Sequence, residues 1–145
     1  MIFRRLTIKS KTVLILEAIA MLMGASTHIS WVIENGLMSK NYNASLFSMV
    51  FWDSLTFLDP IAALLLIIKP KIGLVLTFLI IIVDVIHNNT VYYEELYEQT
   101  ISFYDWINKY WMIAGQLLFA GFVMFAFRPT MRAIRIKEKS SRLLS

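Results

Sequence analysis

The sequence predicts an all-α fold, an integral membrane four-helix bundle with antiparallel transmembrane helices, and three observations lead to it. Hydrophobic residues make up 58% of the 145 residues, and the mean hydropathy is +0.64. The apolar residues gather in four runs, each about the 20 residues that a helix needs to cross a bilayer. Only short polar segments separate these runs, so no length remains for a soluble domain. We therefore expect residues 1–145 to form a single transmembrane domain.

The first apolar run covers about residues 13–33 and follows a short basic segment. A basic start before an apolar run is also typical of a signal peptide, with cleavage near residues 24–26. Glu17 inside the run argues against that interpretation, and so does the length of the run, which suits a bilayer span. We therefore expect a retained first transmembrane helix.

The other three runs cover about residues 46–68, 72–91 and 106–127. The basic turn Lys69-Pro70-Lys71 joins the second run to the third, and a connection this short makes the two helices antiparallel neighbours. Residues 92–105 form a loop rich in Tyr and acidic side chains. Because amphipathic rings favour the membrane interface, this loop is expected to form a short interfacial helix.

The positive charges are distributed unevenly over the two sides of this topology. Twelve of the 14 Lys and Arg residues lie in the N-terminal segment, in the turn at 69–71 or in the tail at 128–145, which all fall on one side. Only Lys40 and Lys109 are left for the other side. Because cytoplasmic segments carry an excess of Lys and Arg, we expect both termini and the basic tail to be cytoplasmic. The two remaining loops would then face outside.

The amino-acid composition excludes several classes of function for this chain. The chain has no cysteine, which excludes disulfides, thiolate metal sites and cysteine nucleophiles. The net charge of +4 lies mostly at the chain ends, where it reports membrane orientation. No basic surface with interleaved aromatic residues supports nucleic-acid binding. We expect membrane lipid around the chain and no cofactor, and the sequence does not determine the oligomeric state.

Each apolar run also carries polar side chains, which are costly in hydrocarbon and need partners or water. A helix rises about 1.5 Å per residue, so position along each run gives an approximate depth. This estimate places side chains from the first three runs in one layer of the outer half, with one Asp nearer the middle of the second run. The candidate ligand-binding residues are His28, Asp53, Asp59, Asp84, His87 and Asn88.

Residues three or four apart share a helix face, which sorts the polar residues into three stripes. We expect all three stripes to face the bundle interior, because the alternative surroundings are lipid. The stripes are Glu17, Met21, Gly24 and His28; Asp53, Thr56 and Asp59; and Thr77, Asp84, His87 and Asn88.

Simpler interpretations apply to other polar residues. A single polar residue in a span often only hydrogen-bonds a neighbouring helix, which is worth about 0.6 kcal/mol on average. Glu17 lies near the cytoplasmic interface, where pairing with Lys9 or Lys11 would explain it. The Tyr and Trp residues at the outer helix ends suit an interfacial belt. The residues assigned to helix–helix hydrogen bonding alone are Thr56, Thr77, Asn89 and Gln116.

Three functions fit an Asp–His layer. A pocket for a small lipophilic or amphipathic ligand, with or without catalysis, is our main interpretation, since such groups can move protons. A proton-coupled carrier would use them as a relay, but the sequence has no internal repeat and four helices are few for alternating access. A metal site would use Asp84-x-x-His87 with Asp53 and His28 as the further ligands, although carboxylate bundle proteins need two Glu-x-x-His motifs. A structural or accessory role is the further alternative, and enzyme activity stays open.

The layout of the first three runs resembles the EXPERA membrane proteins, the family that includes the emopamil-binding sterol isomerases. The shared features are a His in the first span and, in the second span, an acid a few residues before a proline; here these are His28, Asp53 and Asp59-Pro60. The resemblance extends over about residues 20–90. The family has Glu where this chain has Asp53, and its five-span members are longer. The resemblance implies that Asp53 lies in a buried pocket for a sterol-like or other amphipathic ligand, but it does not imply isomerase activity.

Overall fold

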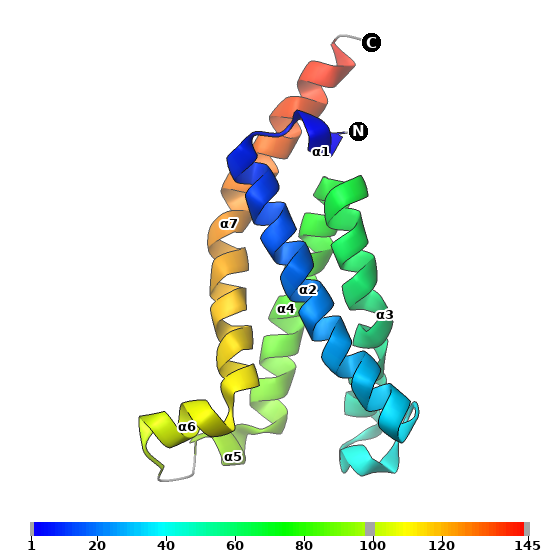
Figure 1. Ribbon diagram of the computed structural model, residues 1–145, viewed down its shortest axis with the longest axis vertical. Coiled ribbons are helices and arrows are strands. Elements are labelled where there is room, and N and C mark those ends of the chain that lie inside the picture. Colours follow the sequence, from blue (N-terminus) through cyan, green and yellow to red (C-terminus); the bar gives the residue numbers. More distant parts are fainter. Residues whose placement is uncertain (1, 98–100, 144–145) are drawn as a thin grey trace.

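The computed structural model describes residues 2–97 and 101–143, except for the side chains of Glu94, Glu95 and Arg142 (Figure 1). Residues 98–100 of the expected loop and residues 144–145 of the tail lie outside the described residues.

Four helices are long and apolar enough to cross a membrane, which confirms the predicted all-α fold with four transmembrane helices. These helices are α2 (Ile8–Asn35), α3 (Leu46–Ile68), α4 (Pro70–Val91) and α7 (Trp111–Arg142).

Capping side chains and a proline help to decide where the long helices begin, and the apolar runs alone did not predict every one of these positions. Helix α2 begins at Ile8, ahead of the apolar run, because the Thr7 hydroxyl accepts a hydrogen bond from the Ser10 amide at 3.3 Å and caps the first turn. Helix α4 begins at Pro70, which has no N–H to lose at a first helical position. The fourth long helix begins at Trp111, because residues 103–109 form a separate helix that the Ser102 side chain caps.

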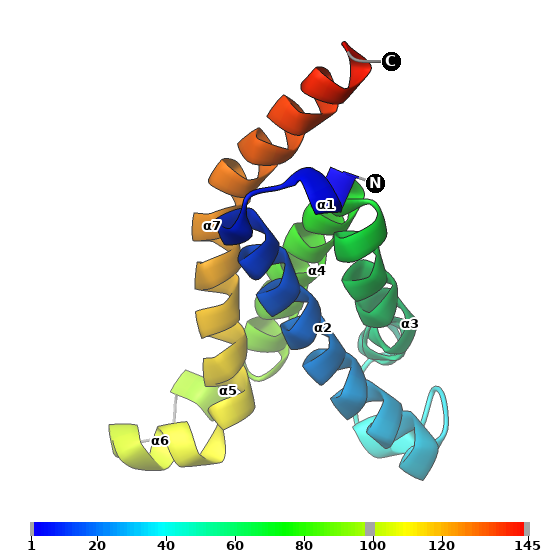
Figure 2. The same ribbon diagram turned by 45° about the horizontal axis from the view of Figure 1, so that its top comes forward.

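The four long helices pack in chain order: α2 against α3, α3 against α4, and α4 against α7. Both termini and the turn between α3 and α4 lie at one end of the bundle, here called the terminal end (Figures 1 and 2). The short helix α1 (Ile2–Arg5) lies there as well. The opposite end, here called the loop end, carries the 3-10 turn η1 (Lys40–Tyr42), α5 (Tyr93–Tyr97) and α6 (Phe103–Lys109). The pieces α5 and α6 fall where a short interfacial helix was expected.

Helices α3 and α4 are in close contact near their shared turn. A Cβ atom added at Gly73 would lie 2.2 Å from the backbone nitrogen of Leu66, so only glycine fits there. Side chains that are almost fully buried fill the interior of the bundle, and they come from all four long helices. They include Leu14, Leu55, Leu66, Leu74, Val123 and Ile134.

The outward surface of the bundle is also strongly apolar. Large hydrophobic side chains are exposed on every long helix, among them Leu22, Phe57, Val83 and Phe125. An exposed apolar surface of this extent suits contact with hydrocarbon rather than water. The chain is therefore an all-α, multi-pass membrane protein.

Candidate functional site

The loop-end half of the bundle contains a hydrogen-bonded network that joins three helices. Buried Asp84 on α4 accepts hydrogen bonds from the side-chain amides of Asn88, at 3.0 Å, and of Gln116 on α7. Asn88 Nδ2 also donates to Gln116 Oε1 at 3.2 Å. On α3, the indole Nε1 of buried Trp52 donates to Asn88 Oδ1 at 2.9 Å. We call Trp52, Asp84, Asn88 and Gln116 the amide network.

A second group of contacts forms around Asp53, also on α3. Its Oδ2 atom accepts a hydrogen bond from the backbone amide of Met38 at 2.6 Å, and its Oδ1 atom accepts one from the Tyr42 hydroxyl at 2.7 Å. The buried carboxylate therefore holds the loop between α2 and α3 against the bundle. Burial, followed by the hydrogen bond to the Asp53 carboxylate and its negative charge, raises the pKa of Tyr42 well above its usual range. His28 of α2 lies within electrostatic reach of the same carboxylate.

Aromatic rings connect the Asp53 contacts to the amide network. The Tyr42 ring lies 4.8 Å from the Trp31 ring and 5.3 Å from the Trp52 ring, measured between centroids. The Trp52 ring in turn stacks on Tyr92 at 6.1 Å. Trp52 thus belongs to both groups, because its ring packs between two tyrosines while its nitrogen donates to Asn88.

A cavity of about 380 Å³ opens beside these rings at the loop end. Its walls come from the loop after η1, from the start of α3 and from the end of α4. The lining residues are Tyr42, Asn43, Ala44, Ser45, Ser48, Trp52, Val91 and Tyr92.

His87 and Asp84 contact different neighbours, although they lie three residues apart on α4. The His87 ring packs against aromatic rings of α3, at 5.5 Å from Phe47 and 4.7 Å from Phe51. Asp84 is instead bonded to Asn88 and to α7. Three residues on a helix of 3.6 residues per turn leave about 60° between two side chains, which is enough to direct them toward different helices.

Asp59 lies deeper in the bundle than the amide network. A Cβ atom added at Gly24 of α2 would lie 3.0 Å from Asp59 Oδ2, so the small residue makes room for the carboxylate. The other oxygen, Oδ1, is buried and has no hydrogen-bond partner among the described residues. Asp59 is within electrostatic reach of Asp84, but no hydrogen bond joins the two described side chains.

The terminal-end half holds Glu17, and the expected pairing with Lys9 or Lys11 is wrong. Glu17 is 0% exposed, and both carboxyl oxygens are buried without a hydrogen-bond partner in the part of the chain that the structure describes. The side chain lies on the inward stripe with Leu14 and Met21, whereas Lys9 lies exposed two helical turns away. The hydroxyl of buried Thr77 on α4 is likewise without a partner among those residues.

The three stripes face inward as predicted, but the sequence did not identify two residues of the loop-end site. Trp52 was not singled out, although it lies four residues before Thr56 and thus on the inward face of α3. Tyr42 lies in an irregular segment, where no periodicity indicates direction. Gln116 was assigned to helix–helix hydrogen bonding, and it does join α7 to α4.

The described side chains include no group of three His, Cys, Asp or Glu residues that is arranged to hold a metal ion. The alternative of a metal site built from Asp84, His87, Asp53 and His28 therefore has no support in the geometry of these residues.

Comparison of the chain with models of known protein families, with curated protein sequences and with solved structures gives no match.

Proposed function

We propose that this membrane protein binds a small amphipathic molecule, with a positively charged head, in the cavity at the loop end. One observation carries the proposal: a cavity of about 380 Å³ is lined by the rings of Tyr42, Trp52 and Tyr92 next to the Asp53–Tyr42 hydrogen bond. Its volume lies within the range of about 300–1,000 Å³ typical of small-molecule sites.

The chemistry of the lining favours a cation over an anion. Aromatic faces attract cations through the ring quadrupole, most strongly where water is excluded. The Asp53 carboxylate does not line the cavity, but it accepts a hydrogen bond from the hydroxyl of the lining residue Tyr42 and so adds a negative charge nearby. The apolar surface of Val91 and of the indole suits the hydrophobic part of such a ligand.

The amide network fixes the position of Trp52, one of the residues that line the cavity. The hydrogen bond from Trp52 to Asn88 holds the indole in one orientation, and Asp84 and Gln116 hold Asn88. In this proposal Asp84 and Asn88 position the cavity wall and do not contact the ligand themselves. The EXPERA resemblance is retained as part of the proposal, with Asp53 as the second-span acid of the pocket and a sterol-like molecule as an alternative ligand.

A structural role is the second candidate, and a specific observation favours it. The hydrogen bonds of Asp84 and Gln116 join α4 to α7, as expected of side chains that only hold a bundle together.

A binding measurement separates the two candidates. The probe is phenyltrimethylammonium, added to the full chain in a neutral detergent and followed by isothermal titration calorimetry. We expect Asp53→Asn to weaken binding roughly tenfold, or about 1.4 kcal/mol. The matched control is Asp105→Asn, which removes the same charge from an exposed position of α6 and should leave the affinity unchanged. Equal affinities for both variants, or no binding to the parent chain, would contradict the proposed site.

We further propose that the loop end faces outside and that both termini are cytoplasmic, on the basis of the uneven distribution of Lys and Arg. A cysteine at Lys40 should react with an impermeant thiol reagent added to intact cells, whereas cysteines at Lys71 and Lys137 should not. Labelling of the Lys71 position from outside would show that the chain has the opposite orientation in the membrane.

A further inference from the structure

The last third of α7 differs from the part that crosses the bundle. Beyond Pro129 the helix leans away from its earlier direction and extends past the other long helices (Figure 2). Proline removes a backbone hydrogen bond inside a helix, which accounts for such a bend.

One face of this segment packs against the terminal end of the bundle. Ile134 is fully buried, Glu138 forms an ion pair with Lys71 at 3.6 Å, and the Ser141 hydroxyl accepts a hydrogen bond from Arg5 Nη1 at 3.0 Å. These contacts, spaced by four and then three residues, fix which side of the helix faces inward.

The other face combines positive charge with exposed apolar side chains. We call it the basic stripe; it consists of Arg132, Arg135, Ile136, Lys139 and Leu143, all exposed.

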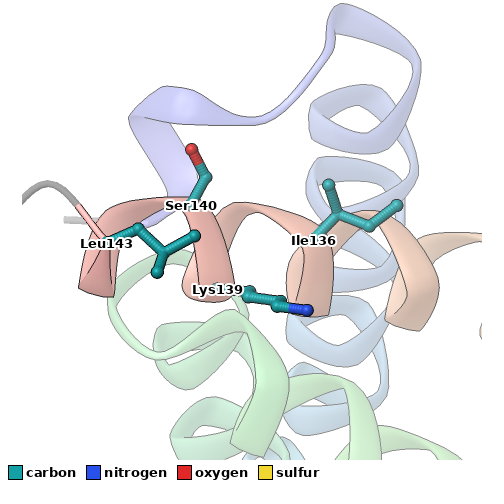
Figure 3. Close-up of a pocket in the computed structure, with 4 residues that line it drawn as sticks. All are labelled: Ile136, Lys139, Ser140 and Leu143. Atoms are coloured by element: carbon teal, nitrogen blue, oxygen red, sulfur yellow. The ribbon is translucent and has the colours of Figure 1, made fainter.

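The two hydrophobic members of the basic stripe, Ile136 and Leu143, are 57% and 78% exposed. They flank Lys139 in a shallow groove of about 410 Å³, which Ser140 completes (Figure 3). None of the three cations of the stripe forms an ion pair with another described residue.

This pattern requires two kinds of partner at once. Three unpaired cations within about 11 Å along the helix, at a rise of about 1.5 Å per residue, attract a phosphate or another anion. The exposed Ile and Leu side chains between and beyond them need apolar surface. The stripe also begins two turns after Phe125, whose exposed ring lies on the membrane-crossing part of the same helix. An anionic phospholipid offers both the charge and the hydrocarbon at this position.

We propose that the basic stripe of α7 is a binding site for an anionic phospholipid. The phosphate contacts Arg132, Arg135 and Lys139, and an acyl chain lies against Ile136 and Leu143. This site is independent of the loop-end cavity, which lies at the opposite end of the bundle.

Native mass spectrometry of the detergent-purified full chain tests this site. The probes are phosphatidylglycerol and phosphatidylcholine with identical acyl chains. We expect the parent chain to retain phosphatidylglycerol preferentially. The variant Arg132→Gln/Arg135→Gln/Lys139→Gln should reduce that adduct roughly tenfold or more, because each basic residue near an anionic surface contributes about 1 kcal/mol.

The matched control removes three positive charges at the same end of the bundle but outside the stripe. Lys9→Gln/Lys11→Gln/Lys69→Gln should leave most of the phosphatidylglycerol adduct in place. If this control loses as much lipid as the stripe variant, attraction by net charge alone explains the binding and the site is overturned.

Three further outcomes decide against the proposal. Equal amounts of phosphatidylcholine and phosphatidylglycerol adduct would show that the three cations do not select the lipid. Full retention of phosphatidylglycerol by Ile136→Ser/Leu143→Ser would show that the two apolar side chains do not contribute to binding. A dimer that the stripe variant abolishes would assign the face to a second copy of the chain. If the triple variant does not fold, the single change Lys139→Gln replaces it, with Lys69→Gln as its control.

Discussion

The two halves of the bundle differ in how their buried carboxyl groups are satisfied. In the loop-end half, both oxygens of Asp53 and of Asp84 accept hydrogen bonds. Toward the terminal end, both oxygens of Glu17 and one oxygen of Asp59 are buried without a partner among the described residues. A buried polar group without a partner costs its full desolvation free energy, whereas a satisfied network gives one defined arrangement. The buried carboxyl groups of the loop-end half are therefore held in one defined arrangement, whereas those toward the terminal end reduce stability.

The largest expected effect is a gain in stability at Glu17. Replacing Glu17 by Met keeps a flexible side chain of similar length and removes two unpartnered oxygens. The free energy of unfolding should rise by about 1–3 kcal/mol, the cost of burying an uncompensated polar group. Equilibrium unfolding in mixed micelles measures it, with the lipid-facing change Leu16→Met as a control. A loss of stability would mean that the Glu17 carboxyl has a partner or a task that the described side chains do not reveal.

The opposite sign is expected for Asp84 in the loop-end half. Asp84→Ala removes one hydrogen-bond acceptor from each of the side-chain amides of Asn88 and Gln116 and should lower the free energy of unfolding by about 1–2 kcal/mol. The comparison is Thr77→Val, which deletes an unpartnered hydroxyl at similar volume and should be neutral or stabilising. If the free energy of unfolding falls by a similar amount in Asp84→Ala and Thr77→Val, the two halves do not differ in how their buried polar groups affect stability.

A smaller effect is expected from the ionisation of Tyr42. Because the pKa of Tyr42 in the folded chain lies above its ordinary value of about 10, the folded state keeps a proton that the unfolded state loses. The stability from this group is complete below about pH 10 and falls as the pH rises above it.

The Asp53→Asn variant should bring the pKa of Tyr42 closer to its ordinary value and make this fall shallower. Tyrosinate absorbance measures the ionisation, and Tyr42→Phe identifies which of the six tyrosines responds. Identical titration curves in the parent chain and in Asp53→Asn would mean that the Tyr42–Asp53 hydrogen bond does not form.

Most of the fold followed from the sequence because hydrophobic runs report helices directly. The predicted run at 46–68 has the same bounds as α3, and the other long helices differ at their ends, where capping by Thr7 and Ser102 decides. The inward direction of Glu17, Asp59 and Asp84 also followed, since helical spacing fixes which residues share a face.

The contacts within the site could not be predicted, because they depend on segments without periodicity. Met38 and Asn43 adopt positive φ angles of 54° and 46°, and these turn the loop so that Tyr42 reaches Asp53. The sequence also grouped Asp84 with His87 by spacing alone. The neighbour that each side chain meets depends on how the helices are rotated, which position along a helix does not give.

The indole N–H signals of the four tryptophans test the central claim, a loop-end site for an amphipathic cation, most directly. Two-dimensional ¹H–¹⁵N NMR of the detergent-solubilised chain follows all four while phenyltrimethylammonium is added. The Trp52 and Trp31 signals should shift together and saturate, because both rings pack against Tyr42. The Trp106 and Trp111 signals should hardly move, and Asp53→Asn should weaken the titration. A uniform, non-saturating shift of all four signals would show that the probe only enters the micelle, and the proposed site would be wrong.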